Sequence, residues 1–181
     1  DYSPAIGATI GSVRLDIEPP GPSRRTAPLA ITEIMPSPPR PYTNELEFVE
    51  IFNSNPFPEE VGGYRLTGEI SYTFPEGMTI AGNAYAIVAR NPTLFQSIYG
   101  IPGLGPFTNF LASEGTLRLR NKEDAVLLEV PYSNHNPWPI GSDESGHSLV
   151  LTRASYGEED PKAWSISPAV GGSPGRQDTA R

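Results

Sequence analysis

The residues of this 181-residue chain that are best suited to acid–base chemistry gather in one short segment, GSDESGHS. Asp143, Ser145 and His147 lie within five positions there, and an acid, a hydroxyl and an imidazole are the groups of a catalytic triad. A triad places its acid and its nucleophile on opposite sides of the imidazole, usually from distant segments. One crowded loop does not provide that arrangement, so we expect no catalytic residue here and no enzymatic activity.

A second candidate for acid–base chemistry is Glu50, which lies between Phe48 and Phe52 on the same face of a predicted strand. Burying a carboxylate between two phenylalanines is costly unless hydrogen-bond donors satisfy it. Glu50 could be a general acid with a raised pKa, or a buried acceptor that locks a loop or a bulge. Because no histidine or aspartate partner accompanies it, the sequence favours the structural role.

Metal binding has one set of candidates, in loops rich in oxygen ligands. The possible calcium ligands are Asp143, Glu144, Glu158 and Asp160. Their spacing is not that of an EF-hand, and the chain has neither an H-E-x-x-H motif for zinc nor any cysteine. We therefore expect solvated turns and no cofactor, with calcium in the region 143–160 as the alternative.

The composition favours a domain made of strands and turns. The chain has 18 glycines and 21 prolines, which argues against long helices, while 37% hydrophobic residues are enough for a core. The formal charge of −8 repels phosphate backbones, so we expect no nucleic-acid partner. The uncharged stretch 91–113 is interrupted by prolines and glycines, which excludes insertion of this stretch into a membrane as a helix.

Nine short runs rich in β-branched and aromatic residues have the spacing of a β-sandwich. They cover residues 29–35, 46–53, 64–68, 70–74, 84–89, 115–120, 125–130, 147–152 and 163–166. Run 115–120 alternates, with Leu117 and Leu119 predicted to face the core and Arg118 and Arg120 the solvent. Run 125–130 is apolar at nearly every position, which predicts a fully buried central strand.

One short helix is predicted over residues 92–99. Asn91 suits its N-cap, Pro92 its first position and Gly100 its end. Its apolar residues share one face and are expected to contact the core; they are Leu94, Phe95, Ile98 and Tyr99.

Read in order, these segments resemble a known family. The blocks ITEIMPSP, LEFVEIFN, VGGYRLTG and YTFPEGMTIAGNAYAIVAR, followed by NPWPIGSDESGHSLVL and GGSPG, resemble the lamin tail domain, most closely its bacterial extracellular type. The resemblance runs over residues 29–175. It implies an all-β, immunoglobulin-like β-sandwich, which the pattern above completes with one short helix, and it implies no general catalytic activity.

The resemblance also maps recurrent family positions onto this chain, which we interpret as scaffold. They include Glu33, Glu50, Asn53, Trp138, Ser148, Trp164, Gly172 and Gly175. It suggests three parts: residues 1–28 as a linker or the edge of a preceding module, 29–176 as the domain, and 177–181 as a C-terminal tail.

Together these observations predict a non-enzymatic structural or protein-interaction module of a larger secreted or cell-surface bacterial protein. We expect an extracellular location, a protein or a surface polymer as partner, and a monomer when the domain is isolated. The predicted contact surface is the apolar loop that carries Ile101, Leu104, Phe107 and Phe110, although this loop could instead cap one end of the sandwich.

A different class of function is the alternative: a carbohydrate-binding accessory module attached to an extracellular enzyme. Its stacking platforms would be Tyr42, Trp138 or Tyr156, with acidic residues nearby.

Overall fold

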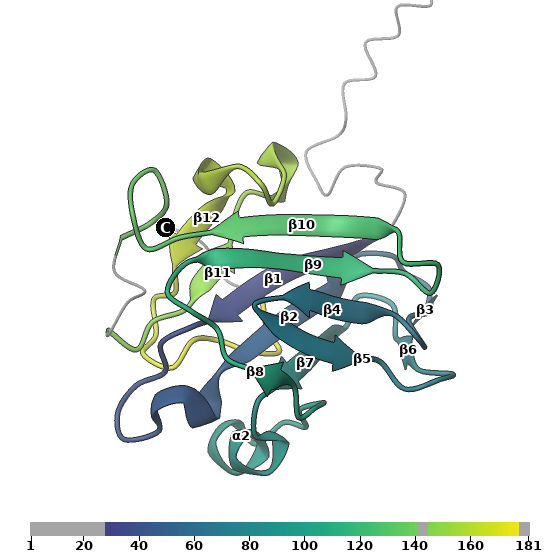
Figure 1. The fold of residues 1–181 in the computed structure, drawn as a ribbon, viewed down its shortest axis with the longest axis horizontal. Coiled ribbons are helices and arrows are strands. Elements are labelled where there is room, and N and C mark those ends of the chain that lie inside the picture. The colour runs from purple at the N-terminus through teal and green to yellow at the C-terminus, as the bar shows by residue number, and fades with distance from the viewer. Residues whose placement is uncertain (1–27, 141–144, 178–181) are drawn as a thin grey trace, which may run out of the picture.

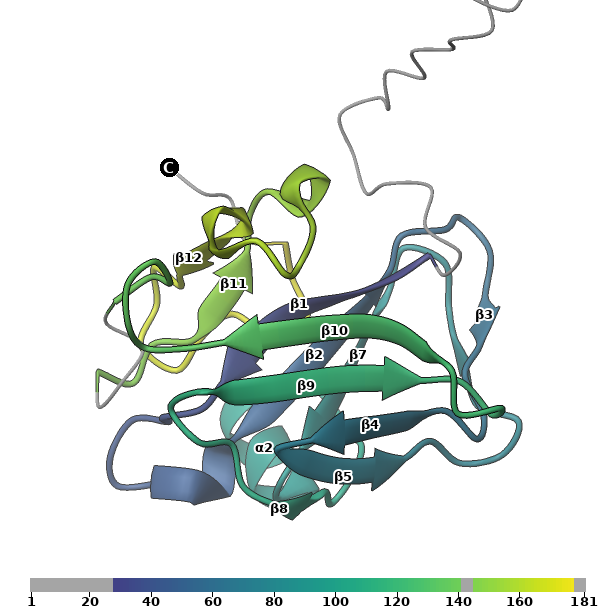
Figure 2. The ribbon, with the colours of Figure 1, turned by 45° about the horizontal axis from the view of Figure 1, so that its top comes forward.

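Two antiparallel sheets packed face to face form the body of the protein. The computed structural model describes residues 28–140 and 145–177. The predicted linker, apart from residue 28, and the last four residues of the predicted tail lie outside the described residues. Figures 1 and 2 show the second sheet lying in front of the first, with the short helix at one end.

The first sheet has the strand order β12-β11-β1-β2-β7. Its strands are β1 (Leu29–Met35), β2 (Phe48–Asn53), β7 (Tyr85–Ala89), β11 (Leu149–Leu151) and β12 (Trp164–Ile166). The long central strands β1 and β2 coincide closely with the predicted runs 29–35 and 46–53. The beginning of the second run instead belongs to a 3₁₀ helix, η1 (Thr43–Leu46).

The second sheet has the order β10-β9-β4-β5-β8. Its strands are β4 (Arg65–Gly68), β5 (Ile70–Thr73), β8 (Thr108–Asn109), β9 (Gly115–Arg120) and β10 (Val126–Tyr132). A separate two-stranded ribbon joins β3 (Glu59–Glu60) to β6 (Thr79–Ile80), and two further 3₁₀ helices are η2 (Ala154–Tyr156) and η3 (Pro161–Ala163). The two-residue strands β3, β6 and β8 were not predicted because they are too short to show alternation.

The core lies between the two sheets and follows the alternation of their strands. In β9, Leu117 and Leu119 are fully buried, as predicted. Arg118 and Arg120 point to the outer face, where Arg118 pairs with Glu129 at 2.6 Å and Arg120 with Asp124 at 3.3 Å. These arginines therefore belong to a solvated, ion-paired surface.

The prediction that run 125–130 is a central strand is wrong. β10 lies at the edge of the second sheet, and its side chains alternate between buried and exposed. Val126 is 45% exposed, and Glu129 faces the solvent on the outer side. The run looked continuous because apolar residues also occupy outward positions at one end of this strand, where a register shift separates Val126 from Leu128.

Helix α2 (Pro92–Tyr99) begins and ends where the sequence predicts. The side chain of Asn91 accepts a hydrogen bond from the Leu94 N–H at 3.1 Å, and Gly100 ends the helix with a φ of 71°. Phe95 is buried against Phe48 of β2, with ring centroids 5.4 Å apart. Ile98 is 43% exposed, so the buried face of the helix is narrower than predicted.

This helix covers one end of the outer face of the first sheet, where it closes a second small apolar cluster. The cluster contains Met35, Phe48, Ile87, Ala89 and Phe95. In the part of the chain that the structure describes, no helix is long and apolar enough to cross a membrane.

Phe95→Ala tests how firmly the helix is held to the sheet. Removing this fully buried ring leaves a cavity in the second cluster, so we expect a loss of roughly 3–5 kcal/mol in the free energy of unfolding. Ile98→Ala, on the exposed side of the same helix, is the matched control and should cost less than about 1 kcal/mol. Chemical denaturation measures both, and equal losses would contradict the assigned packing.

Candidate functional site

Three glutamates on and beside the first sheet are buried, which is unusual for a charged residue. Glu33 on β1 and Glu50 on β2 are register partners, and Glu47 lies between η1 and β2. The register of β1 shifts between Ile31 and Glu33, so both Thr32 and Glu33 fall between the core residues Ile31 and Ile34. This bulge brings Thr32 within reach of Glu50.

Glu50 acts as a buried hydrogen-bond acceptor. The Thr32 hydroxyl donates to its Oε1 at 2.7 Å, and the Gly175 N–H donates to its Oε2 at 2.6 Å. Hydrogen bonds to a carboxylate are stronger than neutral ones, so this pair of contacts fastens the end of the described chain to β2.

Glu33 fastens the same C-terminal segment at a second point. Its Oε1 accepts from the Ser173 N–H at 2.9 Å and from the Ser148 hydroxyl. We call residues 171–175 the C-terminal clasp, because their backbone donates to both buried glutamates. The Tyr99 hydroxyl of α2 adds a third attachment by donating to the Gly171 carbonyl at 2.6 Å, and burial together with Glu33 raises the pKa of Tyr99 to about 12.

The clasp explains why glycine occupies position 172. A Cβ atom there would lie 2.2 Å from the Glu33 Oε1 and 2.9 Å from the Ser148 Oγ, and the φ of Gly172 is 81°.

The sequence GGSPG also has the spacing of a G-x-S-x-G nucleophile elbow. Its Ser173 is buried and follows β12, whereas an elbow presents an exposed serine between a strand and a helix.

The surroundings of Glu47 shift the pKa of its carboxyl group. Its Oε2 accepts from the Leu111 N–H at 3.0 Å and lies 3.5 Å from the Arg90 Nη1. Its Oε1 has no hydrogen-bond partner among the described residues. Burial raises the pKa of Glu47 to about 7, although both the Leu111 N–H and Arg90 act in the opposite direction.

The predicted apolar contact surface does not form as one patch. Phe107 is 4% exposed and belongs to the core, so its assignment to a contact surface is wrong. Leu104 pairs with β7 through its N–H to the Ile87 carbonyl at 2.7 Å, and Ile101 packs against the second cluster. Most of this loop therefore caps the sandwich, and Phe110 alone of the four is exposed, at 55%.

The two predicted calcium ligands that the structure describes, Glu158 and Asp160, have different structural roles. Asp143 and Glu144 lie outside the described residues. Glu158 is buried, with its carbonyl accepting from the indole N–H of Trp164 at 2.9 Å, and Asp160 caps η3 by accepting from the Lys162 N–H at 2.9 Å. Among the residues that are described, no three histidine or acidic side chains form a group that could hold a metal ion.

The remaining candidates are His147 from the predicted triad segment and the aromatic residues predicted to stack on a carbohydrate. A ring nitrogen of His147 lies 2.8 Å from the Ser167 carbonyl. Trp138 is buried and packs on Trp164 with ring centroids 6.0 Å apart, so the expectation that Trp138 is a stacking platform is wrong. Tyr156 is exposed and Tyr42 is half-buried.

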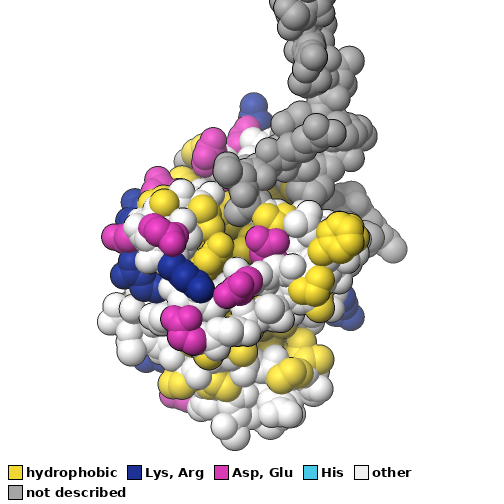
Figure 3. Space-filling view, turned by 90° about the vertical axis from the view of Figure 1, so that its right-hand side faces the viewer, with side chains coloured by type: hydrophobic (Ala, Val, Ile, Leu, Met, Phe, Trp, Pro, Cys, Tyr) yellow, Lys and Arg dark blue, Asp and Glu magenta, His cyan; other side chains and the backbone are white. Residues whose placement is uncertain are grey.

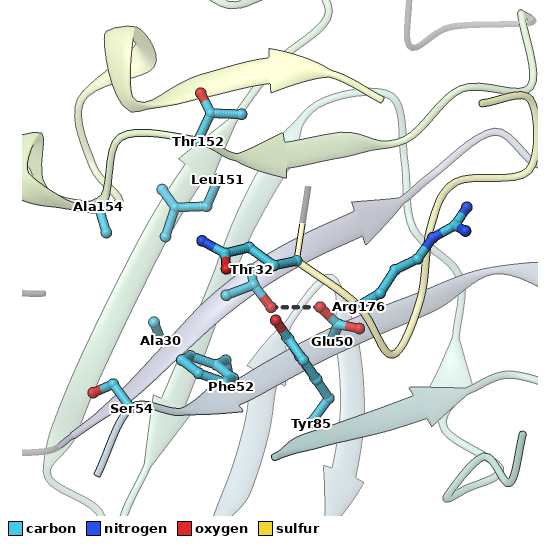
Figure 4. Close-up of a pocket in the computed structure, with 11 residues that line it drawn as sticks. Ala30, Thr32, Glu50, Phe52, Ser54, Tyr85, Leu151, Thr152, Ala154 and Arg176 are labelled. Carbon is cyan, nitrogen blue, oxygen red and sulfur yellow. Dashed lines mark hydrogen bonds between the residues drawn. The ribbon is translucent and has the colours of Figure 1, made fainter. Parts of the chain in front are cut away.

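Beside the clasp, the outer face of the first sheet is hollowed into a cavity of about 190 Å³ (Figure 4). Its lining includes Thr32, Glu50, Phe52, Tyr85, Thr152 and Arg176. Only Glu50 was a sequence candidate. The pairing of Phe52 with Tyr85 across β2 and β7 could have been found by following the outward positions of the two predicted strands.

Gly172→Ala tests the clasp. The added methyl group collides with the Glu33 carboxylate and requires a φ that disfavours L-residues, so we expect a loss of more than about 2 kcal/mol in unfolding free energy. Gly77→Ala is the matched control: its φ is 73° and a Cβ there meets nothing within 4 Å, so it should cost about 1 kcal/mol. Denaturant titration measures both, and similar losses would argue against a crowded clasp.

The raised pKa of Glu47 predicts a pH dependence of stability. Between its ordinary value of 4.5 and about 7, the folded carboxyl holds a proton that the unfolded chain has lost, so stability falls as the pH rises through this window. The decrease amounts to roughly 3 kcal/mol. Glu47→Gln cannot titrate and should lack this contribution when unfolding is measured at about pH 5 and about pH 8. Glu123→Gln, at an exposed position, should keep it; an unchanged pH profile in Glu47→Gln would contradict the assignment.

Comparison with known proteins agrees with this architecture. No curated protein matches the chain. The family description Lamin Tail Domain matches residues 22–159, more than half of the chain. That family has an immunoglobulin-like fold without catalytic function, and the two facing antiparallel sheets with one short helix are consistent with it. The chain therefore belongs to the lamin tail domain family.

Proposed function

We propose that this chain is a non-catalytic interaction module within a larger secreted or cell-surface bacterial protein. The observation that carries the proposal is that its buried carboxylates serve as hydrogen-bond acceptors within the fold. Glu33, Glu47 and Glu50 each accept hydrogen bonds from the backbone of a distant segment, which makes them parts of the scaffold. Membership of the lamin tail domain family supports a structural or protein-interaction role.

Phe110 is the residue through which such a module would contact a protein partner. It is 55% exposed, on the loop that follows β8, while the adjacent Leu111 is buried and its N–H is held by Glu47. An exposed aromatic ring on a fixed backbone loses little conformational entropy when it binds. On the face shown in Figure 3, by contrast, hydrophobic side chains lie in separate groups between charged ones.

A binding experiment with the isolated chain tests this proposal. The immobilised chain is exposed to surface proteins solubilised from cells that encode it, and retained proteins are quantified by mass spectrometry. We expect at least one protein to be retained with an affinity that Phe110→Ser lowers about thirtyfold, because an aromatic anchor contributes about 2 kcal/mol or more.

Phe57→Ser is the matched control, because Phe57 is 70% exposed on the loop before β3. Retention should be unchanged in this variant. If every retained protein binds the two variants equally, Phe110 is not the contact.

Labelling of the full-length protein by a membrane-impermeant reagent on intact cells tests its surface location, and labelling only after lysis would contradict it.

A further inference from the structure

The cavity on the outer face of the first sheet offers an unusual set of hydrogen-bond acceptors. Four residues with a hydroxyl group line it, and the three aliphatic hydroxyls among them already donate their hydrogen to the protein. Thr32 donates to Glu50 at 2.7 Å, Ser54 to the Pro28 carbonyl at 2.7 Å, and Thr152 to the Ala163 carbonyl at 3.3 Å. A hydroxyl oxygen that has donated can still accept, so these groups favour a ligand that donates several hydrogen bonds.

One wall of the cavity is aromatic. The rings of Phe52 and Tyr85 pack with centroids 4.7 Å apart, and both side chains are half-buried. Figure 4 shows them on one side of the cavity, with Leu151, Thr152 and Ala154 on the other. Such a pair presents apolar area with fixed geometry, which packs well against a ligand that has an apolar face.

The rim adds hydrogen-bond donors. Gln177 lines the cavity and carries amide N–H groups, and Arg176 lines it as well, with its guanidinium directed away from the other labelled side chains in Figure 4. The lining carries one basic group, Arg176, and one carboxyl group, Glu50, so it selects for neither a cationic nor an anionic ligand, and the formal charge of −8 on the chain further disfavours a strongly anionic one. The ligand that fits is therefore neutral, with many groups that both donate and accept, and with one apolar face.

We propose that this cavity binds one neutral pyranose residue of a glycan. A pyranose ring has C–H groups on one face for the Phe52 and Tyr85 rings and hydroxyl groups around its edge for the acceptors and donors. The volume of about 190 Å³ is below the roughly 300–1,000 Å³ of sites for drug-sized ligands, and so suits a single ring. This site goes beyond the protein contact proposed through Phe110 and does not depend on it.

Tyr156 gives the site room to extend. It ends η2, the turn that begins with the lining residue Ala154, and it is 54% exposed. A neighbouring sugar of the same glycan could pack on this ring. The alternative of a carbohydrate-binding module thus acquires a specific site, built on Phe52 and Tyr85 instead of Trp138.

Saturation-transfer difference NMR on the whole chain tests the proposal. The probes are the methyl glycosides of glucose, galactose, mannose and N-acetylglucosamine, with methylguanidinium as a cationic probe. We expect at least one glycoside to bind with a millimolar dissociation constant, as is ordinary for a small polar ligand. Binding of no glycoside, or of methylguanidinium alone, overturns the proposal.

Two variants localise the binding to the cavity. Ala154→Phe fills it and should abolish the transfer signal, and Thr152→Val removes one acceptor while keeping the side-chain shape and should weaken binding about threefold or more. Thr108→Val is the matched control, because Thr108 is an exposed threonine on β8, away from the cavity lining, with a 3.4 Å hydrogen bond to the Ser71 carbonyl.

Thermal unfolding and dispersed amide spectra establish that each variant is folded. If Ala154→Phe does not fold, the comparison of Thr152→Val with Thr108→Val decides. Equal binding by these two variants, or wild-type binding by folded Ala154→Phe, places the sugar elsewhere and overturns the proposal. These measurements are independent of the Phe110 experiment, so either proposal can be contradicted without the other.

Discussion

A buried carboxylate must be satisfied, and this requirement organises the outer face of the first sheet. An isolated charge in a protein interior is too costly to persist, so each such group either finds donors or holds a proton. Glu33 and Glu50 find donors in the C-terminal clasp, and Glu47 finds one in Leu111 while its pKa rises to about 7. Three features accommodate these acceptors: the bulge in β1, the glycine at position 172 and the path of the clasp across the sheet.

The sequence predicted most of the local structure and little of the site. Alternation in β9 and the capping residues of α2 are local signals, and they identified those elements correctly. The position of β10 at an edge is not a local property, because an apolar run has the same appearance with one neighbouring strand or two. Phe107 and Phe110 illustrate the same limit: both are aromatic residues of one loop, and only tertiary packing separates the buried ring from the exposed one.

The site shows why its residues escape a search for motifs. Glu50 was recognised as a candidate from its neighbours, since a carboxylate between two phenylalanines is conspicuous in any strand. Its donors were not recognisable, because one is the backbone N–H of Gly175, which has no side chain to signal the contact. The cavity likewise combines side chains from β1, β2, β7 and the segment after β11, and no two of these segments are joined by a short turn.

The clasp has a consequence for how the chain reaches this structure during synthesis. Its hydrogen bonds join Ser173 to Glu33 and Gly175 to Glu50, pairs that lie 140 and 125 residues apart. Contacts of such long sequence separation slow folding, because the intervening chain must lose its freedom before they form. Until residues 171–175 have left the ribosome, Glu33 and Glu50 lack these backbone donors, and both carboxylates remain able to hydrate. The outer face of the first sheet is therefore completed only after the clasp itself has left the exit tunnel, so docking of the clasp is the step that closes the domain.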